Sequence, residues 1–146
     1  MATSPFVQQG TLNRLRGSVV YASNQTLNVT APYLSKEGIS IAFEGDAGML
    51  IPTLTGGVTS PEPYQIATVT INLVKSQALA NVYKEQFETN VNVGDVSVIA
   101  DSATLTDYEL QNCVLKGIRD ITFDGNQAGF VVTLQGIYQV NSALWA

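Results

Sequence analysis

The sequence contains no histidine and only one cysteine, Cys113. Without histidine the chain cannot build a Ser-His-Asp or Cys-His nucleophilic centre, and it lacks the commonest neutral metal ligand. A single cysteine cannot form an intramolecular disulfide or a structural zinc site, and it fits a reducing compartment. We therefore expect Cys113 to be a small core residue, and we expect the protein to need neither a metal nor a cofactor.

Charge is sparse as well. Charged residues make up 13% of the chain, about half of the roughly 25% that is typical of soluble domains. Two explanations remain open: other copies cover part of the surface, or the surface is rich in Thr, Ser, Asn and Gln. Because twelve acids oppose seven bases, the net charge is −5. This balance supplies no affinity for phosphate backbones, so tight nucleic-acid binding is not expected.

Long apolar runs are also missing. No stretch approaches the roughly 18 apolar residues of a membrane-spanning helix, and the first residues lack the pattern of a secretory signal. Neither a P-loop nor a dinucleotide-binding fingerprint occurs. We therefore expect a protein without a membrane segment that folds in a cytoplasm.

Paired carboxylates are the remaining route to catalysis or to Ca²⁺ binding. Glu44 and Asp46 lie beside one turn, and Asp120 and Asp124 lie beside another. The turn itself explains Asp124, and its loop lacks the terminal glutamate of an EF-hand. The pattern favours turn residues over a catalytic or metal site, so the protein is not expected to be an enzyme.

Alternating apolar and polar residues, typical of strands with one buried face, run through most of the chain. The clearest strands are expected over residues 64–74 and 130–140. Residues 49–55 are expected to return beside the strand at 39–43, whereas the glycines and prolines of 56–63 favour an irregular exposed connection. Further strands are expected over residues 18–22, 27–30, 91–100 and 108–116, and a hairpin signal lies at 124–126.

The hydrophobic period changes only once. Between Ser76, a candidate N-cap, and Thr89, apolar residues recur at spacings of three and four, which predicts one helix with a narrow apolar stripe. We expect a mainly β fold, a β-sandwich or barrel with one flanking α-helix at about Ser76–Thr89. The length fits a single domain of residues 1–146, with an amino-terminal arm (1–16) and a long loop (44–63).

Several segments resemble the tail tube proteins of contractile-tailed bacteriophages, and together they cover nearly the whole chain. They are Leu12-Asn13-Arg14-Leu15, Leu27-Asn28-Val29-Thr30-Ala31-Pro32, Thr59-Ser60-Pro61-Glu62-Pro63-Tyr64, Gln77-Ala78-Leu79-Ala80 and the pair of strands between Asp107 and Tyr138. The resemblance implies a tail-tube-like sandwich whose copies close into hexameric rings. These rings stack into the inner tail tube of a virion, assembled in the host cytoplasm. The implied partners are other copies, tail sheath, baseplate and tail terminator proteins, and DNA that passes through without tight binding.

Contacts between copies are expected in the arm, in the long loop and at the carboxyl terminus. Either a partner's carboxylates or solvent alone could surround the arginines of the arm. A large aromatic near a chain end docks on its own core or on a neighbour. A loop this long in a compact domain is usually functional. The candidate contact residues are Phe6, Leu12, Arg14, Arg16, Glu44, Asp46, Met49, Ile51, Pro61, Pro63 and Trp145.

Three other interpretations stay open. A terminator or baseplate ring component, or a bacterial secretion tube protein, would share the architecture. A sandwich that binds a small ligand or a carbohydrate would need an exposed aromatic cluster. An enzyme would have to work with carboxylates alone.

Overall fold

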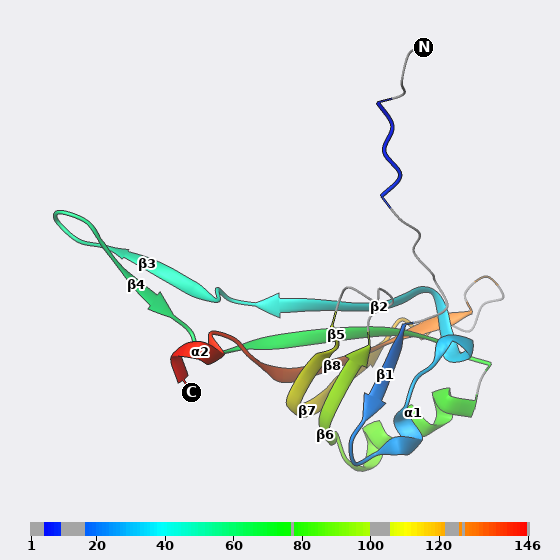
Figure 1. Ribbon diagram of the computed structural model, residues 1–146. Coiled ribbons are helices and arrows are strands. Elements are labelled where there is room, and N and C mark those ends of the chain that lie inside the picture. Colours follow the sequence, from blue (N-terminus) through cyan, green and yellow to red (C-terminus); the bar gives the residue numbers. More distant parts are fainter. Residues whose placement is uncertain are drawn as a thin grey trace.

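The centre of the structure, a computed structural model, is one six-stranded antiparallel sheet in the order β1-β6-β7-β8-β5-β2. The structure describes residues 5–9, 17–76, 78–99, 106–121, 126 and 128–145, without the side chains of Ala31, Lys36 and Trp145. The sheet curls into a half-barrel (Figure 1), which confirms the mainly β prediction. Its strands are β1 (Ser18–Tyr21), β2 (Leu34–Glu44), β5 (Tyr64–Val74), β6 (Asn92–Ile99), β7 (Tyr108–Arg119) and β8 (Gly129–Gln139).

Short helical elements flank this sheet. The predicted helix is present as α1 (Ala78–Thr89), and it buries Leu79 and Tyr83 against the core. Two 3-10 turns, η1 (Gln25–Leu27) and η2 (Ala31–Tyr33), connect β1 to β2, and a short helix α2 (Ser142–Trp145) follows β8. The narrow apolar stripe of α1 therefore lies on a sheet, as the sequence predicts.

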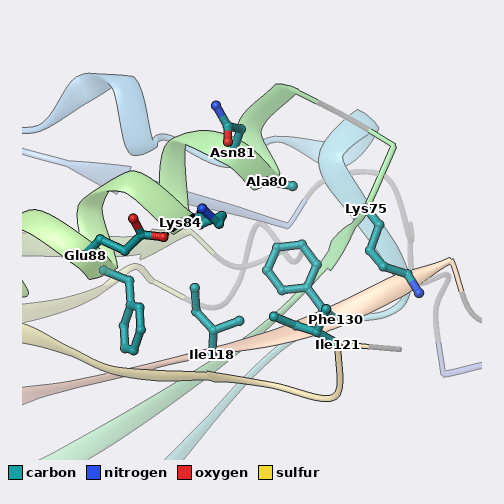
Figure 2. Close-up of a pocket in the computed structure, with 9 residues that line it drawn as sticks. Lys75, Ala80, Asn81, Lys84, Glu88, Ile118, Ile121 and Phe130 are labelled. Atoms are coloured by element: carbon teal, nitrogen blue, oxygen red, sulfur yellow. Dashed lines mark ion pairs between the residues drawn. The ribbon is translucent and has the colours of Figure 1, made fainter. Parts of the chain in front are cut away.

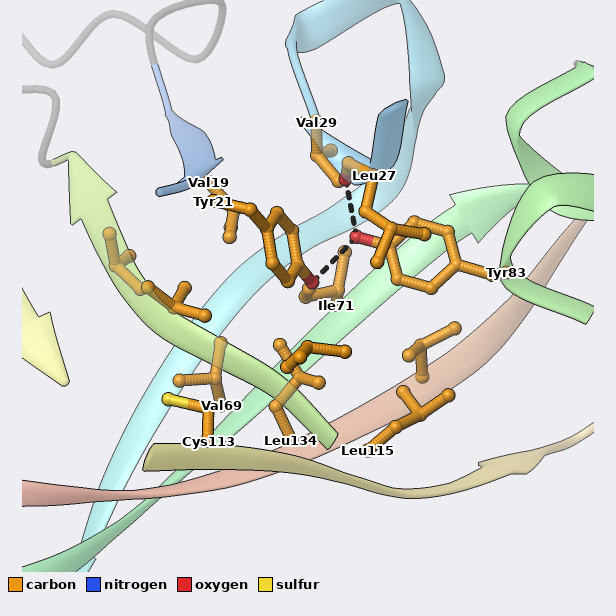
Figure 3. Close-up of a cluster of buried hydrophobic side chains, with 14 of the residues drawn as sticks. Val19, Tyr21, Leu27, Val29, Val69, Ile71, Tyr83, Cys113, Leu115 and Leu134 are labelled. Carbon is orange, nitrogen blue, oxygen red and sulfur yellow. Dashed lines mark hydrogen bonds between the residues drawn. The ribbon is translucent and has the colours of Figure 1, made fainter. Parts of the chain in front are cut away.

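The core lies inside the curl of the sheet and follows from the period-2 patterns of β5 and β8. Alternate residues of β5 are buried, and the register sets three of them opposite a large apolar residue of β8. These pairs are Val69 with Leu134, Ile71 with Val132 and Leu73 with Phe130. Figure 3 shows the side chains of Tyr21 in β1 and Leu27 in η1 facing those of β5 and β8, with Cys113 of the neighbouring strand β7 beside them. Cys113 is a buried core residue, as expected.

A buried hydrogen-bonded chain ties α1 to β1 and η1. The Tyr83 hydroxyl donates to the Leu27 carbonyl oxygen at 2.7 Å. The hydroxyls of Tyr21 and Tyr83 are 2.8 Å apart. Because the Tyr83 proton is engaged by Leu27, the Tyr21 hydroxyl donates to Tyr83 (Figure 3). This chain satisfies the polar groups that the aromatic residues bring into the core.

The buried phenols and the buried thiol make alkaline pH destabilising. Burial raises the pKa of both Tyr21 and Tyr83, and it raises the pKa of Cys113 to about 12. The folded chain thus keeps these protons at a pH where the unfolded chain releases them. Their contribution to stability is complete below the unfolded pKa values, about 8.5 for Cys and about 10 for Tyr, and is lost above them.

We therefore expect the free energy of unfolding to fall as the pH rises from 9 to 11.5. Each tyrosine contributes up to about 1.4 kcal/mol per pH unit above its unfolded pKa. Urea denaturation at several pH values measures the slope. Cys113→Ala should remove most of the fall below pH 10 and lessen the fall above it, because the thiol pKa is about 12 in the folded chain. A stability that stays constant over this range would contradict the prediction.

The long loop differs from the sequence prediction. Residues 49–55 do not return beside β2, because β3 (Gly48–Pro52) pairs with β4 (Gly57–Pro61) instead. Residues 56–63, expected to be irregular, therefore include a strand. Its proline is tolerated because Pro61 lies at the end of a two-stranded ladder, where a missing N–H costs little.

Residues 27–30 also differ from the expected strand. They contain the end of η1 and an isolated bridge, in which Val19 and Val29 exchange N–H···O bonds of 3.0 and 2.9 Å. The Asn28 side chain accepts a hydrogen bond from the Tyr21 N–H at 2.8 Å, which replaces a further ladder bond. The hairpin signal at 124–126 lies mostly outside the described residues.

Candidate assembly surface

The hairpin formed by β3 and β4 extends beyond the six-stranded sheet (Figure 1). All of its residues from Gly48 to Thr59 are exposed. The register, with Ile51 opposite Val58 and Met49 opposite Ser60, places Met49, Ile51 and Val58 on one face of the ribbon. Their side chains are 58%, 45% and 55% exposed. A contiguous apolar face in water is uncommon on a monomer and is typical of an interaction surface.

The base of the hairpin is fixed to the sheet domain, unlike its arms. The Glu62 N–H donates to the Ala47 carbonyl oxygen at 3.0 Å. The Asn141 side-chain amide donates to the carbonyl oxygens of Ala47 and Glu62, at 2.9 and 2.8 Å. Beyond this base, and within the described part of the chain, β3 forms strand pairs with β4 alone. The hairpin is therefore a separate projection on a rigid base.

One edge of the six-stranded sheet is also available for pairing. At the β1 edge, the bridge to Val29 engages backbone groups of Val19. At the other edge, the eleven-residue strand β2 has only β5 as a neighbour among the described strands. A long edge strand presents a row of N–H and C=O groups that another chain can pair with.

Three aromatic rings lie at the end of the sheet from which the hairpin leaves. The Phe43 ring centroid is 5.2 Å from that of Tyr138 and 6.1 Å from that of Tyr108. Tyr108 and Tyr138 pack against the core, while Phe43 is 40% exposed. The rings are tilted onto one another, so they close the end of the core and do not form a flat platform for a sugar or base.

The structure places the candidate residues in three regions. Met49, Ile51 and Pro61 belong to the hairpin, and exposed Asp46 and Pro63 lie close to its base. Phe6 is exposed in the described segment 5–9. Leu12, Arg14 and Arg16 lie outside the described residues. Trp145 belongs to α2 by its backbone, and its side chain is not described.

The carboxylate of Glu44 is hydrogen-bonded by two side chains of neighbouring strands. Its Oε1 accepts hydrogen bonds from the Thr68 hydroxyl and from the Gln135 side-chain amide, both at 3.2 Å. These bonds hold the carboxylate on the outer face of the sheet, at the end of β2. This arrangement gives Glu44 a structural role at the end of β2.

A largely apolar groove of about 530 Å³ lies between α1 and the sheet. Figure 2 shows Ile118, Ile121 and Phe130 below the helix, with Lys84 and Glu88 on it. Lys84 and Glu88 form an exposed ion pair of 2.7 Å, and the hydrogen bond to Glu88 raises the pKa of Lys84. Among the described lining residues, the one carboxylate, that of Glu88, is thus already paired. The groove is formed by elements about 40 residues apart in sequence, so periodicity could not reveal it.

The described residues hold no cluster of three His, Cys, Asp or Glu side chains suited to a metal ion. Within the same ranges, no helix is both long and apolar enough to cross a membrane.

Comparison with known proteins bears on the fold. No protein-family model and no curated protein matches the sequence. The cap of the anti-feeding prophage, described as its tube terminating cap, aligns with a TM-score of 0.54 and 16% identity, over 94% of this chain and 97% of that chain. A chain from the sheath–tube complex of an extracellular contractile injection system (PVC), in its extended state, aligns with a TM-score of 0.55 and 14% identity, over 90% and 94% of the two chains. The chain therefore has a fold that is found in components of contractile injection machines.

Proposed function

We propose that this chain is a structural subunit, not an enzyme, which assembles with its own copies into stacked rings that form the tube of a contractile tail. The observation that carries this proposal is the projecting hairpin, whose apolar face is exposed in the single chain. The shared fold with injection-machine components supports it. Residues 1–146 act as one domain in this proposal, and the arm of residues 1–16 adds contacts between copies.

Burial of the hairpin on a neighbouring copy would supply the free energy of assembly. A fully buried Val, Leu, Ile or Met side chain contributes about 1.5–3 kcal/mol. Burial of Met49, Ile51, Leu54 and Val58 on a neighbouring copy would therefore favour the contact against the rigid-body and side-chain freedom that association costs. The open edge of β2 offers a second contact, and a head-to-tail contact that closes on itself gives a ring.

The other partners follow from this role. A tube in a virion tail meets the sheath outside, the baseplate at one end and a terminator at the other. The excess of acids over bases suits a channel through which DNA passes without tight binding, because few cations replace the DNA counterions. Folding in the host cytoplasm precedes incorporation into the virion.

A cap or terminator ring is a second candidate function. The match to the tube terminating cap covers 97% of that chain, so nearly its whole length aligns with this one. A cap would use the same ring contacts on one side only, and its rings would not extend into a tube. A bacterial secretion tube would be built from the same kind of ring but would not be part of a virion.

We expect the purified chain to form rings or tubes of uniform diameter as its concentration rises. Negative-stain electron microscopy identifies the particles, and light scattering gives the onset concentration. Long tubes support the tube role, whereas single rings that never lengthen support the cap. A protein that stays monomeric at every concentration and salt condition would reject both.

A further inference from the structure

A second cavity, of about 400 Å³, lies on the face of the sheet that points away from the core. It spans the neighbouring strands β5, β8 and β7 (Figure 1). On β8, Thr133 is opposite Thr70 of β5 on one side and Gly117 of β7 on the other. The lining consists of Thr68, Thr70, Lys116, Gly117, Arg119 and Thr133.

An irregularity in β7 brings both cations of this cavity together. Residues at an odd spacing, such as Lys116 and Arg119, would lie on opposite faces of a regular strand. The register shifts between Leu115 and Gly117, so Lys116 is an extra residue opposite β8. A bulge of this kind redirects side chains next to it, and both cations line the cavity.

A buried hydroxyl in the cavity has no partner. Thr133 is 6% exposed, and its Oγ1 forms no hydrogen bond with any described residue. Most buried polar atoms in proteins are hydrogen-bonded, so this hydroxyl calls for a partner that the described residues do not supply, such as an ordered water or an anion. Next to it, a Cβ placed on Gly117 would meet no atom within 4 Å, so the cavity beside Thr133 is open.

The charged side chains that line the cavity, Lys116 and Arg119, are both positive. Among the described residues, neither Lys116 nor Arg119 pairs with a carboxylate. The carboxylate of Glu44 is near the opposite end, where it accepts the Thr68 hydrogen bond. An anion would therefore lie toward Thr70, Thr133 and the two cations, away from Glu44.

We propose that this cavity binds a phosphate group. An arginine side chain recognises phosphate with two parallel N–H donors, a lysine adds a compact charge, and threonine hydroxyls donate further bonds. Two cations match the charge of free phosphate, largely a dianion near neutral pH, better than that of one carboxylate. A backbone phosphodiester carries one negative charge, so its recognition would depend on the hydrogen bonds to its oxygens. The group can come from free phosphate or from a nucleic-acid backbone. This site is a property of the single chain, and it does not depend on the tube proposal.

Calorimetric titration of the full-length, unassembled chain with inorganic phosphate, at constant ionic strength, tests the site. We expect saturable binding that Arg119→Gln weakens about tenfold or more, since it removes charge-assisted hydrogen bonds. Gly117→Val should weaken binding similarly without changing any charge, because it fills the cavity. Lys84→Gln, which removes one charge outside the cavity, is the matched control and should leave binding unchanged.

A second titration, with a short DNA duplex, separates the two sources. Binding of both ligands identifies a backbone phosphate as a ligand, and binding of phosphate alone identifies the free ion. Three results would overturn the proposal: no saturable phosphate binding, equal losses in Lys84→Gln and Arg119→Gln, or acetate binding as tightly as phosphate.

Discussion

A chain in which Asn-Gly replaces residues 48–61 is expected to fold normally and to lose assembly. The Glu62 N–H already donates to the Ala47 carbonyl oxygen, and Asn141 holds both residues in place. A two-residue turn can therefore close the ends without moving the sheet. The removed residues form strand pairs only with one another within the described structure, so the free energy of unfolding should change by less than about 1 kcal/mol.

Assembly should respond far more strongly than folding. Loss of the exposed apolar side chains of the hairpin removes several kcal/mol from each contact between copies, which raises the onset concentration by about 100-fold or more. Light scattering against concentration measures the onset, and urea denaturation measures folding. Normal tubes from this variant would place stacking elsewhere, and a variant that fails to fold would assign the hairpin to the core of its own subunit.

Two point variants of the hairpin refine the test. Ile51 lies on the face that carries Met49 and Val58, whereas Leu50, opposite Thr59, lies on the other face. Ile51→Ser should impair assembly more than Leu50→Ser, although Leu50 is the more exposed of the two residues, at 67% against 45%. Hydrogen exchange gives an independent measure, because the hairpin amides should gain protection only on assembly.

The strands that bury one face could be predicted from the sequence. Residues 64–74 were expected as a strand, and β5 has the same bounds. The last strand is β8, one residue earlier at each end than expected. In such strands the burial of alternate residues enforces both the conformation and the register, so the period-2 pattern carries the information.

The sequence predicted that the segment of the hairpin is apolar and exposed. It did not predict that β3 pairs with β4. Because β3 and β4 are exposed on both faces over most of their length, neither shows an alternation that would specify a partner. Rules on proline and glycine then predicted a loop over 56–63, although a free two-stranded ribbon tolerates Pro61 at its end.

Contacts between residues far apart in the chain could not be predicted from the sequence. The hydroxyl contact between Tyr21 and Tyr83 joins residues 62 positions apart. The cavity on the outer face depends on the bulge near Lys116, and bulges leave no fixed residue pattern at this position. Sequence reasoning consequently missed the phosphate site, and the net charge of −5 even argued against it.

Gly136→Val is expected to lower the free energy of unfolding by about 3 kcal/mol or more, near the top of the range for overpacked cores. Gly136 is buried in β8, and a Cβ there would overlap the Cys113 Sγ and lie 3.0 Å from the Leu110 Cβ. The register shift between Gln111 and Val114 of β7 includes Cys113, so this thiol occupies the space that a side chain at position 136 would need.

Gly117→Val is the matched control, because its Cβ meets no atom within 4 Å and valine favours strands. Thermal unfolding should show a midpoint lowered by roughly 5–10 °C for Gly136→Val and little change for Gly117→Val. Adding Cys113→Ala to Gly136→Val removes the overlapping sulfur and should restore part of the loss, as residues in contact are energetically coupled. Equal losses at both glycines, or no recovery in the double variant, would show that the close contact between β7 and β8 does not determine the cost.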